Sequence, residues 1–389
     1  MTLRFLTAGE SHGPSMMAIL DGIPAGLPIN VNFINHELHR RQSGFGSGPR
    51  MKIEEDTGVI LSGVMEGRTI GSPITILVEN SDHKKWKNKL IEPMTIPRPG
   101  HADLTGSVKY GFKDIRPALE RASARETTMR VAIGSICKML LSQFRIKVEG
   151  YVKSIGEIES NLTNIPLQER MALAEQNKVR CPDHAASKKM IDRISEIILQ
   201  KDTLGGVIEI LVLGLPIGLG SYSQWDKRLE ARIGAAVLSV QAMKGIEFGD
   251  AWENSRLPGS IAHDAIQLYG DQLVRPTNRA GGIEGGISNG QPIILRAAIK
   301  PIATTLSPQI SVNLASGVQG PTKYERSDFC PVPRAVPILE SMVAFVIADA
   351  LIEKLGGDSI EEMKTRFDQL RGAKLNELPM DNHVHKYWE

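Results

Sequence analysis

The sequence predicts an α+β fold in which a helical core is layered against antiparallel β-sheets. Residues 57–63 and 72–78 are β-rich runs that flank the turn residues Glu66, Gly67 and Arg68, as in a β-hairpin. Long apolar segments with helical spacing recur later in the chain. Strands do not alternate strictly with helices, which a doubly wound parallel sheet would require.

Three core helices are expected. The first spans about residues 117–144, because Pro117 suits a first helical position and an apolar stripe follows it. The second covers residues 226–244, and the third covers residues 335–355, where a glycine pair ends it. The stripe of the first helix consists of Met129, Ala132, Ile136 and Leu140.

Strands are expected at residues 205–213 and 291–299, and the more polar segment 150–201 is expected to be an excursion between two halves. Residues 67–74 and 286–293 both read G-x-x-x-G-x-P-I, and each precedes a β-rich run and then an apolar helix. This echo predicts an internal duplication. We expect one catalytic domain over residues 1–372, followed by a polar C-terminal tail over residues 373–389.

Composition narrows the class of protein. The 389 residues include 41% hydrophobic residues, which fits a globular protein with a substantial hydrophobic core. The formal net charge of +2 predicts no nucleic-acid or membrane partner. Three widely spaced cysteines exclude a disulfide framework. Glu10 and His12 interrupt the apolar N-terminus too early for a signal peptide, so we expect a cytoplasmic chain. Charged residues within 335–351 favour a buried helix over a membrane span.

Arginines form the first candidate site. Arg125 falls on the apolar stripe of the first expected helix, with Arg121 one turn earlier on the same side. A buried guanidinium needs an anionic partner. That partner is either a ligand or an internal carboxylate, Glu120 or Glu126, unless the side chain snorkels at the helix end.

Further arginines favour a ligand. Arg41 and Arg50 bracket a glycine-rich loop that can bring guanidinium and backbone N–H groups to a phosphate or carboxylate, although a solvated surface loop is the alternative. Arg98 lies in a proline-stiffened turn, and Arg326 precedes Asp328 by two residues. So many arginines on stiff or glycine-rich backbone, in a chain of near-neutral charge, predict one small, multiply anionic ligand.

Two histidines are candidate proton donors. His12 and His101 both lie in loops among small residues, where an imidazole can reach a ligand, although a structural role is equally compatible with each one alone. Neither has metal-ligand spacing to another histidine or a cysteine, so no metal is expected. Ser11 beside His12 lacks the nucleophile-elbow motif of a hydrolase.

A third glycine cluster, residues 280–290, lets backbone approach a flat or phosphorylated ligand closely. It lacks the strand and helix context of a dinucleotide fingerprint. Lys300 and Thr304 follow the next expected strand and offer a cation and a hydroxyl.

Taken in order, these segments resemble the chorismate synthase family from residue 7 to about 355. The resemblance is carried by TAGESHGP at 7–14, IPAGLPI at 23–29, HRRQSGFGSGPRMKIE at 39–54, RPGHADLTGSVKYGF at 98–112, LERASARETTMRVAIG at 119–134, SYSQWDKRLEARIGAAVLSVQAMKGIEFG at 221–249, GGIEGGISNGQPI at 281–293, KPIATT at 300–305 and ERSDFCPVPRA at 325–335.

The resemblance implies a lyase that converts 5-enolpyruvylshikimate 3-phosphate to chorismate and phosphate by 1,4-elimination, with reduced FMN but no net redox change. It implies that His12 and His101 donate protons, one toward the phosphate and one toward the flavin, and that Asp328 assists removal of the substrate proton through the flavin N5. Substrate contacts are implied for Ser11, Arg41, Arg50, Arg98 and Arg125. FMN contacts are implied for Arg121, Ala122, Ser123, Gln241, Ala242, Gly285, Lys300, Pro301, Ile302, Ala303, Thr304 and Arg326.

Two positions depart from the family pattern. Ser47 replaces an arginine associated with anion or pyridine-nucleotide contact, which weakens an NADP site at Arg41 and Ser47. Phe329 replaces the proline that usually follows the Ser-Asp pair. The chain carries no flavin-reducing domain, so we expect an external reductant, and the resemblance implies a homotetramer.

Two other functions compete with this interpretation. An ordinary flavin oxidoreductase would use the same FMN contacts, but the arginines around His12 and His101 suit a phosphorylated dicarboxylate better than a hydride acceptor. A nucleic-acid or anion-binding module would need excess positive charge and stacking aromatics. Aromatic residues make up only 5% of the chain.

Overall fold

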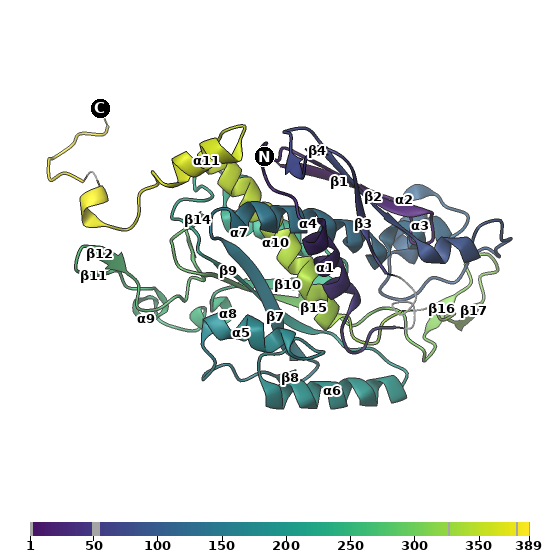
Figure 1. Cartoon of the computed structure of the whole chain (residues 1–389). Helices are drawn as coiled ribbons and strands as arrows, with labels where there is room; N and C mark the ends of the chain where they lie inside the picture. The colour runs from purple at the N-terminus through teal and green to yellow at the C-terminus, as the bar shows by residue number, and fades with distance from the viewer. Residues whose placement is uncertain (1–2, 49–54, 326, 379, 389) are drawn as a thin grey trace.

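Two antiparallel sheets enclose a layer of helices, as Figure 1 shows for the computed structural model, which describes residues 3–48, 55–325, 327–378 and 380–388. The first sheet has the order β1-β2-β6-β3 and the second β10-β15-β9-β7-β8, with every paired strand antiparallel. The predicted α+β class is confirmed. The strands are β1 (Arg4–Ala8), β2 (Ser15–Asp21), β3 (Gly58–Ser62), β6 (Ile74–Glu79), β7 (Lys147–Ile155), β8 (Ile158–Glu159), β9 (Gly206–Leu213), β10 (Met243–Phe248) and β15 (Ile293–Ile299).

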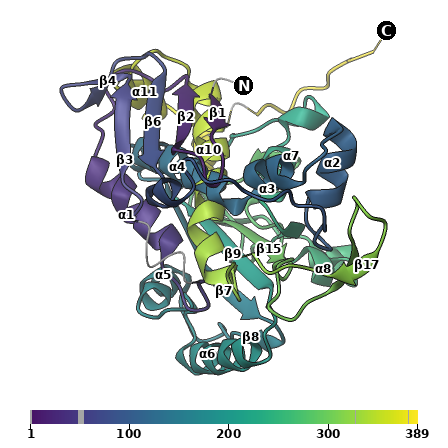
Figure 2. The ribbon, with the colours of Figure 1, turned by 90° about the vertical axis from the view of Figure 1, so that its right-hand side faces the viewer.

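Four helices fill the space between the sheets, and Figure 2 shows the same layers from the side. They are α1 (Val31–Gln42), α4 (Thr127–Ser142), α7 (Leu229–Leu238) and α10 (Val332–Leu355). Strand β6 alternates buried and less buried side chains, as expected for a sheet with one face on a core. Helix α10 is apolar on all sides, and all but Arg334, Glu353 and Lys354 of its residues are buried.

Helix α10 is the one helix in the described part of the chain that is long and apolar enough to cross a membrane, and its most apolar 18-residue stretch is entirely buried inside the protein. The predicted buried core helix at its position is therefore confirmed. It crosses α4 at very short range, because a Cβ atom on Gly134 would lie 2.1 Å from the Cβ of Ser341. Only a glycine allows this approach of the two backbones.

The two halves of the chain share one connection order. The first half runs β1, β2, α1, β3, β6, α4, and the second runs β7, β9, α7, β10, β15, α10. In both sheets the corresponding strands are neighbours in the same sequence, β1-β2-β6-β3 and β7-β9-β15-β10. The two copies of the G-x-x-x-G-x-P-I echo end on the first residues of β6 and β15, which are equivalent strands. This correspondence is what the predicted duplication requires.

Smaller elements surround this frame. The helices are α2 (Asp103–Tyr110), α3 (Arg116–Ala122), α5 (Leu167–Glu175), α6 (His184–Leu199), α8 (Ala251–Asn254), α9 (Gly259–Ala262) and α11 (Ile360–Phe367), with 3₁₀ turns η2 (Ser81–Lys85), η3 (Ala124–Glu126), η4 (Trp225–Lys227) and η5 (Leu375–Glu377). The short strand pairs are β4 (Val64–Met65) with β5 (Arg68–Thr69), β11 (Gln267–Tyr269) with β12 (Gln272–Val274), β13 (Ile283–Glu284) with β14 (Ile287–Ser288), and β16 (Ile310–Val312) with β17 (Gln319–Pro321).

Several expected boundaries were wrong. The helix expected over residues 117–144 is interrupted at Ser123, whose backbone is extended and whose hydroxyl accepts the N–H of Arg125 to start η3. The helix expected over residues 226–244 ends at Leu238, and β10 begins soon afterwards. The segment 150–201 is no mere excursion, because β7 is an inner strand of the second sheet.

The hairpin predicted over residues 57–78 is confirmed, with β3 paired to β6. The predicted strands at 205–213 and 291–299 are also present, as β9 and β15. The division at residue 372 stays a prediction. The N–H of Leu273 donates to the carbonyl of Ala373, so the beginning of the tail pairs with β12.

A buried ionic cluster joins the core helices. Arg40 of α1 donates to both oxygens of Glu340 on α10, at 2.7 and 3.0 Å, and to Glu37 at 3.0 Å. Lys138 of α4 lies 2.5 Å from Glu37 and from Glu340. Burial alone would raise the pKa of Glu340, but the charges of Arg40 and Lys138 outweigh burial and lower that pKa from 4.5 to about 2.

Replacing Glu340 by glutamine should lower the free energy of unfolding at pH 7 by about 3–5 kcal/mol, because Arg40 and Lys138 would remain buried with only Glu37 as a shared carboxylate. Urea denaturation measures this. Since the folded-state pKa of Glu340 is depressed, its contribution is complete above the ordinary value of 4.5 and is lost as the pH falls toward 2. The difference between the wild type and Glu340→Gln should therefore shrink in that window. Glu353→Gln, on the exposed side of α10, is the control and should change stability by at most about 0.5 kcal/mol.

Candidate active site

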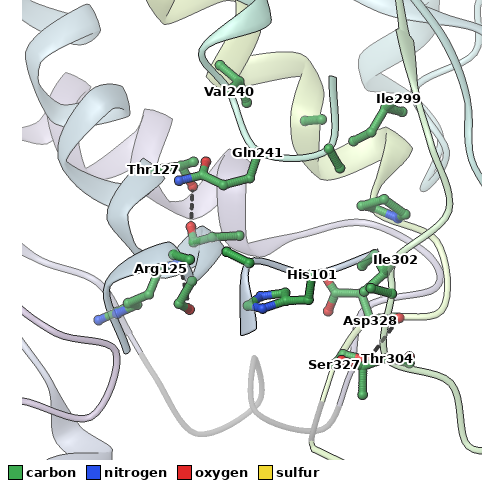
Figure 3. Close-up of a pocket in the computed structure, with 18 of the residues that line it drawn as sticks. His101, Arg125, Thr127, Val240, Gln241, Ile299, Ile302, Thr304, Ser327 and Asp328 are labelled. Carbon is green, nitrogen blue, oxygen red and sulfur yellow. Dashed lines mark hydrogen bonds between the residues drawn. The ribbon is translucent and has the colours of Figure 1, made fainter. Parts of the chain in front are cut away.

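A cavity of about 610 Å³ opens among the loops at one end of the helical layer. Its walls come from the β1–β2 turn, the C-terminal end of α1, the α3–η3 break, the turn between α7 and β10, the segment after β15 and the residues that lead into α10. Figure 3 shows His101, Gln241, Thr304 and Asp328 around it. Segments distant in sequence thus contribute to one site.

Most of the residues that the sequence singles out lie on this wall. They are Ser11, His12, Arg41, Arg98, His101, Ala122, Ser123, Arg125, Gln241, Ala242, Lys300, Pro301, Ile302, Ala303, Thr304 and Asp328. Arg50 and Arg326 lie outside the described residues. Arg121, Gly285 and Ser47 are not on the wall.

The break at Ser123 separates the two arginines that were expected on one helical face. Arg125 is buried, whereas Arg121 is exposed and donates to the Thr7 carbonyl at 2.9 Å. The prediction that Arg121 and Arg125 lie on the same side of one helix was therefore wrong. Gly285 is exposed in the β13–β14 turn, and the Ser47 hydroxyl donates to the Gly44 carbonyl at 2.9 Å.

A buried carboxylate holds two arginines together. Asp56 accepts from Arg125 at 2.9 Å and from Arg41 at 3.3 Å. Arg125 also donates to the Asn80 side chain at 2.9 Å, and Arg41 donates to the Thr127 hydroxyl at 2.9 Å. An internal carboxylate does pair with Arg125, but it is Asp56 and not Glu120 or Glu126, which the sequence offered as the alternatives to a ligand. The guanidiniums are fixed in position before any ligand arrives.

Arg98 and His101 share a second carboxylate. Arg98 contacts both oxygens of Asp103, at 2.8 and 2.9 Å, and donates to the Thr304 hydroxyl at 3.0 Å. The Nδ1 atom of His101 lies 2.5 Å from Asp103. Burial alone would raise the pKa of Asp103, but hydrogen bonds from Arg98 and His101 outweigh it and hold that pKa well below its usual range.

His12 is held between a carboxylate and an indole. Its Nδ1 atom lies 2.8 Å from Glu120, and its ring centroid lies 4.2 Å from that of Trp86. The turn that carries His12 is fixed by Asn80, whose side-chain amide donates to the Gly13 carbonyl at 2.8 Å. Gly9 starts this turn at a φ of 110°, where a Cβ atom would lie 2.5 Å from the Ser15 carbonyl oxygen.

Asp328 lies beside the N-terminal end of α10. Its carboxylate accepts the backbone N–H of Gly48 at 2.8 Å and pairs with Arg334. Arg334 also donates to the Arg41 carbonyl at 2.8 Å. One arginine thus ties the carboxylate to the end of α1, which carries Arg41.

Another part of the cavity wall is made largely of backbone and apolar side chains. It consists of residues 240–244 and 299–304, joined where the N–H of Lys300 donates to the Ala242 carbonyl at 3.0 Å. Ala242 has a φ of 68°, a strained conformation for a residue with a side chain and one that clusters at functional sites. The Lys300 ammonium donates to the Gly100 carbonyl at 2.6 Å, next to His101.

Comparison with known proteins agrees with this arrangement. The family model described as chorismate synthase matches residues 3–352. The chain belongs to the chorismate synthase family. A chorismate synthase from Chlorobium luteolum is 47% identical over 389 residues, which cover 95% of this chain and 98% of the relative. One from Syntrophotalea carbinolica is 48% identical over 371 residues, with 93% and 96% covered.

A solved structure titled as chorismate synthase superimposes with a TM-score of 0.78 at 42% identity, and covers 95% of this chain and 97% of that one. The family identified from the sequence motifs is confirmed. Its members are carbon–oxygen lyases, so this chain is an enzyme of that class.

The sequence did not reveal the partners of the chorismate synthase motif residues. Asp103 lies two positions after His101, and this short spacing was the only local indication that a carboxylate contacts a motif residue. Asp56, Asn80 and Trp86 meet the site through contacts with residues far along the chain, and Arg334 does so through the Arg41 carbonyl. No periodicity indicates such contacts.

Replacing Asp56 by asparagine should lower the free energy of unfolding by about 3–5 kcal/mol at pH 7, because two buried guanidiniums would lose the carboxylate between them. Urea denaturation followed by circular dichroism measures the loss. Glu55→Gln makes the same charge change at the exposed neighbouring position and should cost at most about 0.5 kcal/mol. Equal stability of the two variants would show that other groups balance Arg41 and Arg125.

Proposed function

We propose that this chain is a chorismate synthase of the shikimate pathway, which leads to the aromatic amino acids. It would convert 5-enolpyruvylshikimate 3-phosphate to chorismate and phosphate by an anti-1,4-elimination that requires reduced FMN without net redox change. The observation that carries the proposal is the placement of two carboxylate-bound histidines among three buried arginines in one cavity.

The cationic wall suits the substrate. Two carboxylates and a phosphate need several guanidinium groups, which bind such anions with paired hydrogen bonds. Arg41, Arg98 and Arg125 are buried and line the cavity, so they would bind these groups with little rearrangement. Ser11 lies beside them, with its hydroxyl 3.1 Å from that of Ser123. Arg50 completes the set as a proposal from the sequence alone.

The elimination breaks a carbon–oxygen bond to phosphate and a carbon–hydrogen bond. The leaving phosphate takes up a proton, and we assign His12 as its donor because Glu120 and Trp86 hold the imidazole at the wall of the cavity. His101, held by Asp103, is the second proton donor and would face the flavin. The Asp328 carboxylate, held by the Gly48 N–H and by Arg334, would assist removal of the substrate proton.

The part of the cavity lining formed by residues 240–244 and 299–304 fits FMN. Its backbone and apolar surface suit a flat ring, and the Lys300 ammonium and Thr304 hydroxyl suit a phosphate. The residues that would hold the cofactor are Ala122, Ser123, Gln241, Ala242, Lys300, Pro301, Ile302, Ala303 and Thr304. Reduced FMN, when bound, supplies electron density beside the substrate. Arg121, Gly285 and Arg326 stay proposals from the family pattern, as does a weak NADP contact at Arg41 and Ser47.

We further propose that the chain forms a homotetramer in the cytoplasm. Another protein would supply the reduced flavin, and neither nucleic acid nor a membrane would be a partner. The outer face of the first sheet supports self-association, since it exposes apolar side chains that a second copy could cover. The exposed fractions there are 60% for Leu6, 44% for Ile19, 46% for Val59 and 57% for Leu61.

The deciding experiment is an anaerobic assay of phosphate release from 5-enolpyruvylshikimate 3-phosphate, with and without reduced FMN. We expect release only with reduced FMN, and many turnovers for each flavin that stays reduced. Oxidation of one flavin per product would identify an ordinary oxidoreductase, and release without flavin would overturn the proposal.

His12→Ala should lower kcat by about 10²–10⁴-fold, the usual contribution of a general acid. The affinity for FMN, measured by anaerobic titration, should be retained, since the proposed flavin wall lies elsewhere in the cavity. His36→Ala, on the exposed side of α1, is the control and should behave as the wild type. A rate near that of the wild type in His12→Ala would exclude the assigned role.

A further inference from the structure

Glu120 contacts the proposed acid His12 twice. One carboxylate oxygen accepts the backbone N–H of His12 at 2.8 Å, and the other lies 2.8 Å from the Nδ1 atom of the ring. Both side chains are only 13% exposed. The carboxylate therefore fixes the turn and the imidazole at the same time.

Hydrogen-bond chemistry decides which ring nitrogen carries hydrogen. An ionised carboxylate only accepts hydrogen bonds, so the Nδ1 atom beside it must be the donor. Burial alone would raise the pKa of Glu120, but its contacts with His12 outweigh burial and lower that pKa, so the carboxylate is ionised near neutral pH. With Nδ1 occupied in this way, proton exchange with a ligand has to use Nε2.

Trp86 restricts the remaining freedom of the ring. Its indole packs on the imidazole with an interplanar angle of 41°, and the guanidinium of Arg116 lies 5.4 Å from the indole centroid. A 180° flip of the ring about Cβ–Cγ would place Cδ2 where Nδ1 lies and would break the contact with Glu120.

We propose that Glu120 is a positioning residue that fixes the His12 ring with hydrogen on Nδ1 and thereby presents Nε2 to the cavity. The effect on the reaction rests on the proposed function, whereas the choice of tautomer does not. Glu120 differs from Asp103, the partner of His101, because Asp103 is also bound by both Nε and Nη2 of Arg98. Arg116 comes no closer to Glu120 than 3.8 Å, so a change at Glu120 acts mainly on His12.

Glutamine at position 120 makes a sharp test. A glutamine side chain has one accepting oxygen and one donating NH₂ group. The backbone N–H of His12 can only donate and will keep the oxygen, so the NH₂ group will face Nδ1. The ring must then accept at Nδ1 and carry its hydrogen on Nε2. Glu120→Gln should reverse the tautomer, whereas Glu120→Asp keeps two accepting oxygens and should retain it.

The tautomer is read by magic-angle-spinning ¹⁵N NMR of protein labelled at histidine and free of substrate and flavin. His12→Asn assigns the resonances by their loss. A His12 tautomer that is the same in the wild type and in Glu120→Gln would overturn the proposal. Because no turnover is involved, the reversal can be seen even if the proposed reaction fails.

A double-mutant cycle gives the kinetic test. Glu120→Gln should lower kcat by about 10²-fold or more in the wild-type background, as a wrongly protonated imidazole does in other enzymes, and should cost little in the His12→Asn background. An equal loss in both backgrounds would mean that Glu120 acts through the fold and not through His12. Glu10→Gln, which removes an exposed carboxylate from the same turn, should leave kcat and the tautomer unchanged. Thermal unfolding of each variant checks that it is folded.

Discussion

The pairing of Arg40 with Glu340 in the middle of the protein sets the geometry on which the cavity depends. It joins α1 to α10, and Lys138 brings α4 to the same point. Successive residues of a helix point about 100° apart, so Arg41, one position after this anchor, turns out of the core and onto the cavity wall. The same anchor places the start of α10, from which Arg334 reaches Asp328. A buried charge pair therefore fixes two walls of the site.

The cations of the cavity are balanced from behind. Asp56 holds Arg41 and Arg125, and Asp103 holds Arg98 together with His101. Each carboxylate is buried and leaves the guanidiniums on the cavity wall. The protein can thus concentrate positive charge in one place without large mutual repulsion, and a ligand meets donors that are already oriented.

The sequence predicted local features well and tertiary partners poorly. The sequence pattern that predicts each of these elements lies within the element itself. This holds for the hairpin, helix α10, and strands β9 and β15. The break at Ser123 was missed because one side-chain hydrogen bond overrides a long apolar stripe. Asp56 lies 69 residues before Arg125, and no spacing rule connects them. The positions of the motif residues could be predicted, but the carboxylates that hold them could not.

The two halves of the chain share one connection order but differ in the length of an equivalent connection. Strands β1 and β2 are joined by six residues that carry Ser11 and His12, whereas the equivalent strands β7 and β9 are joined by residues 156–205, which include α5 and α6 and none of which lines the cavity. The scaffold is nearly symmetric, and the chemistry is not. Equivalent connections of unequal length therefore contribute unequally to the cavity, because the short connection of the first half lines it and residues 156–205 do not.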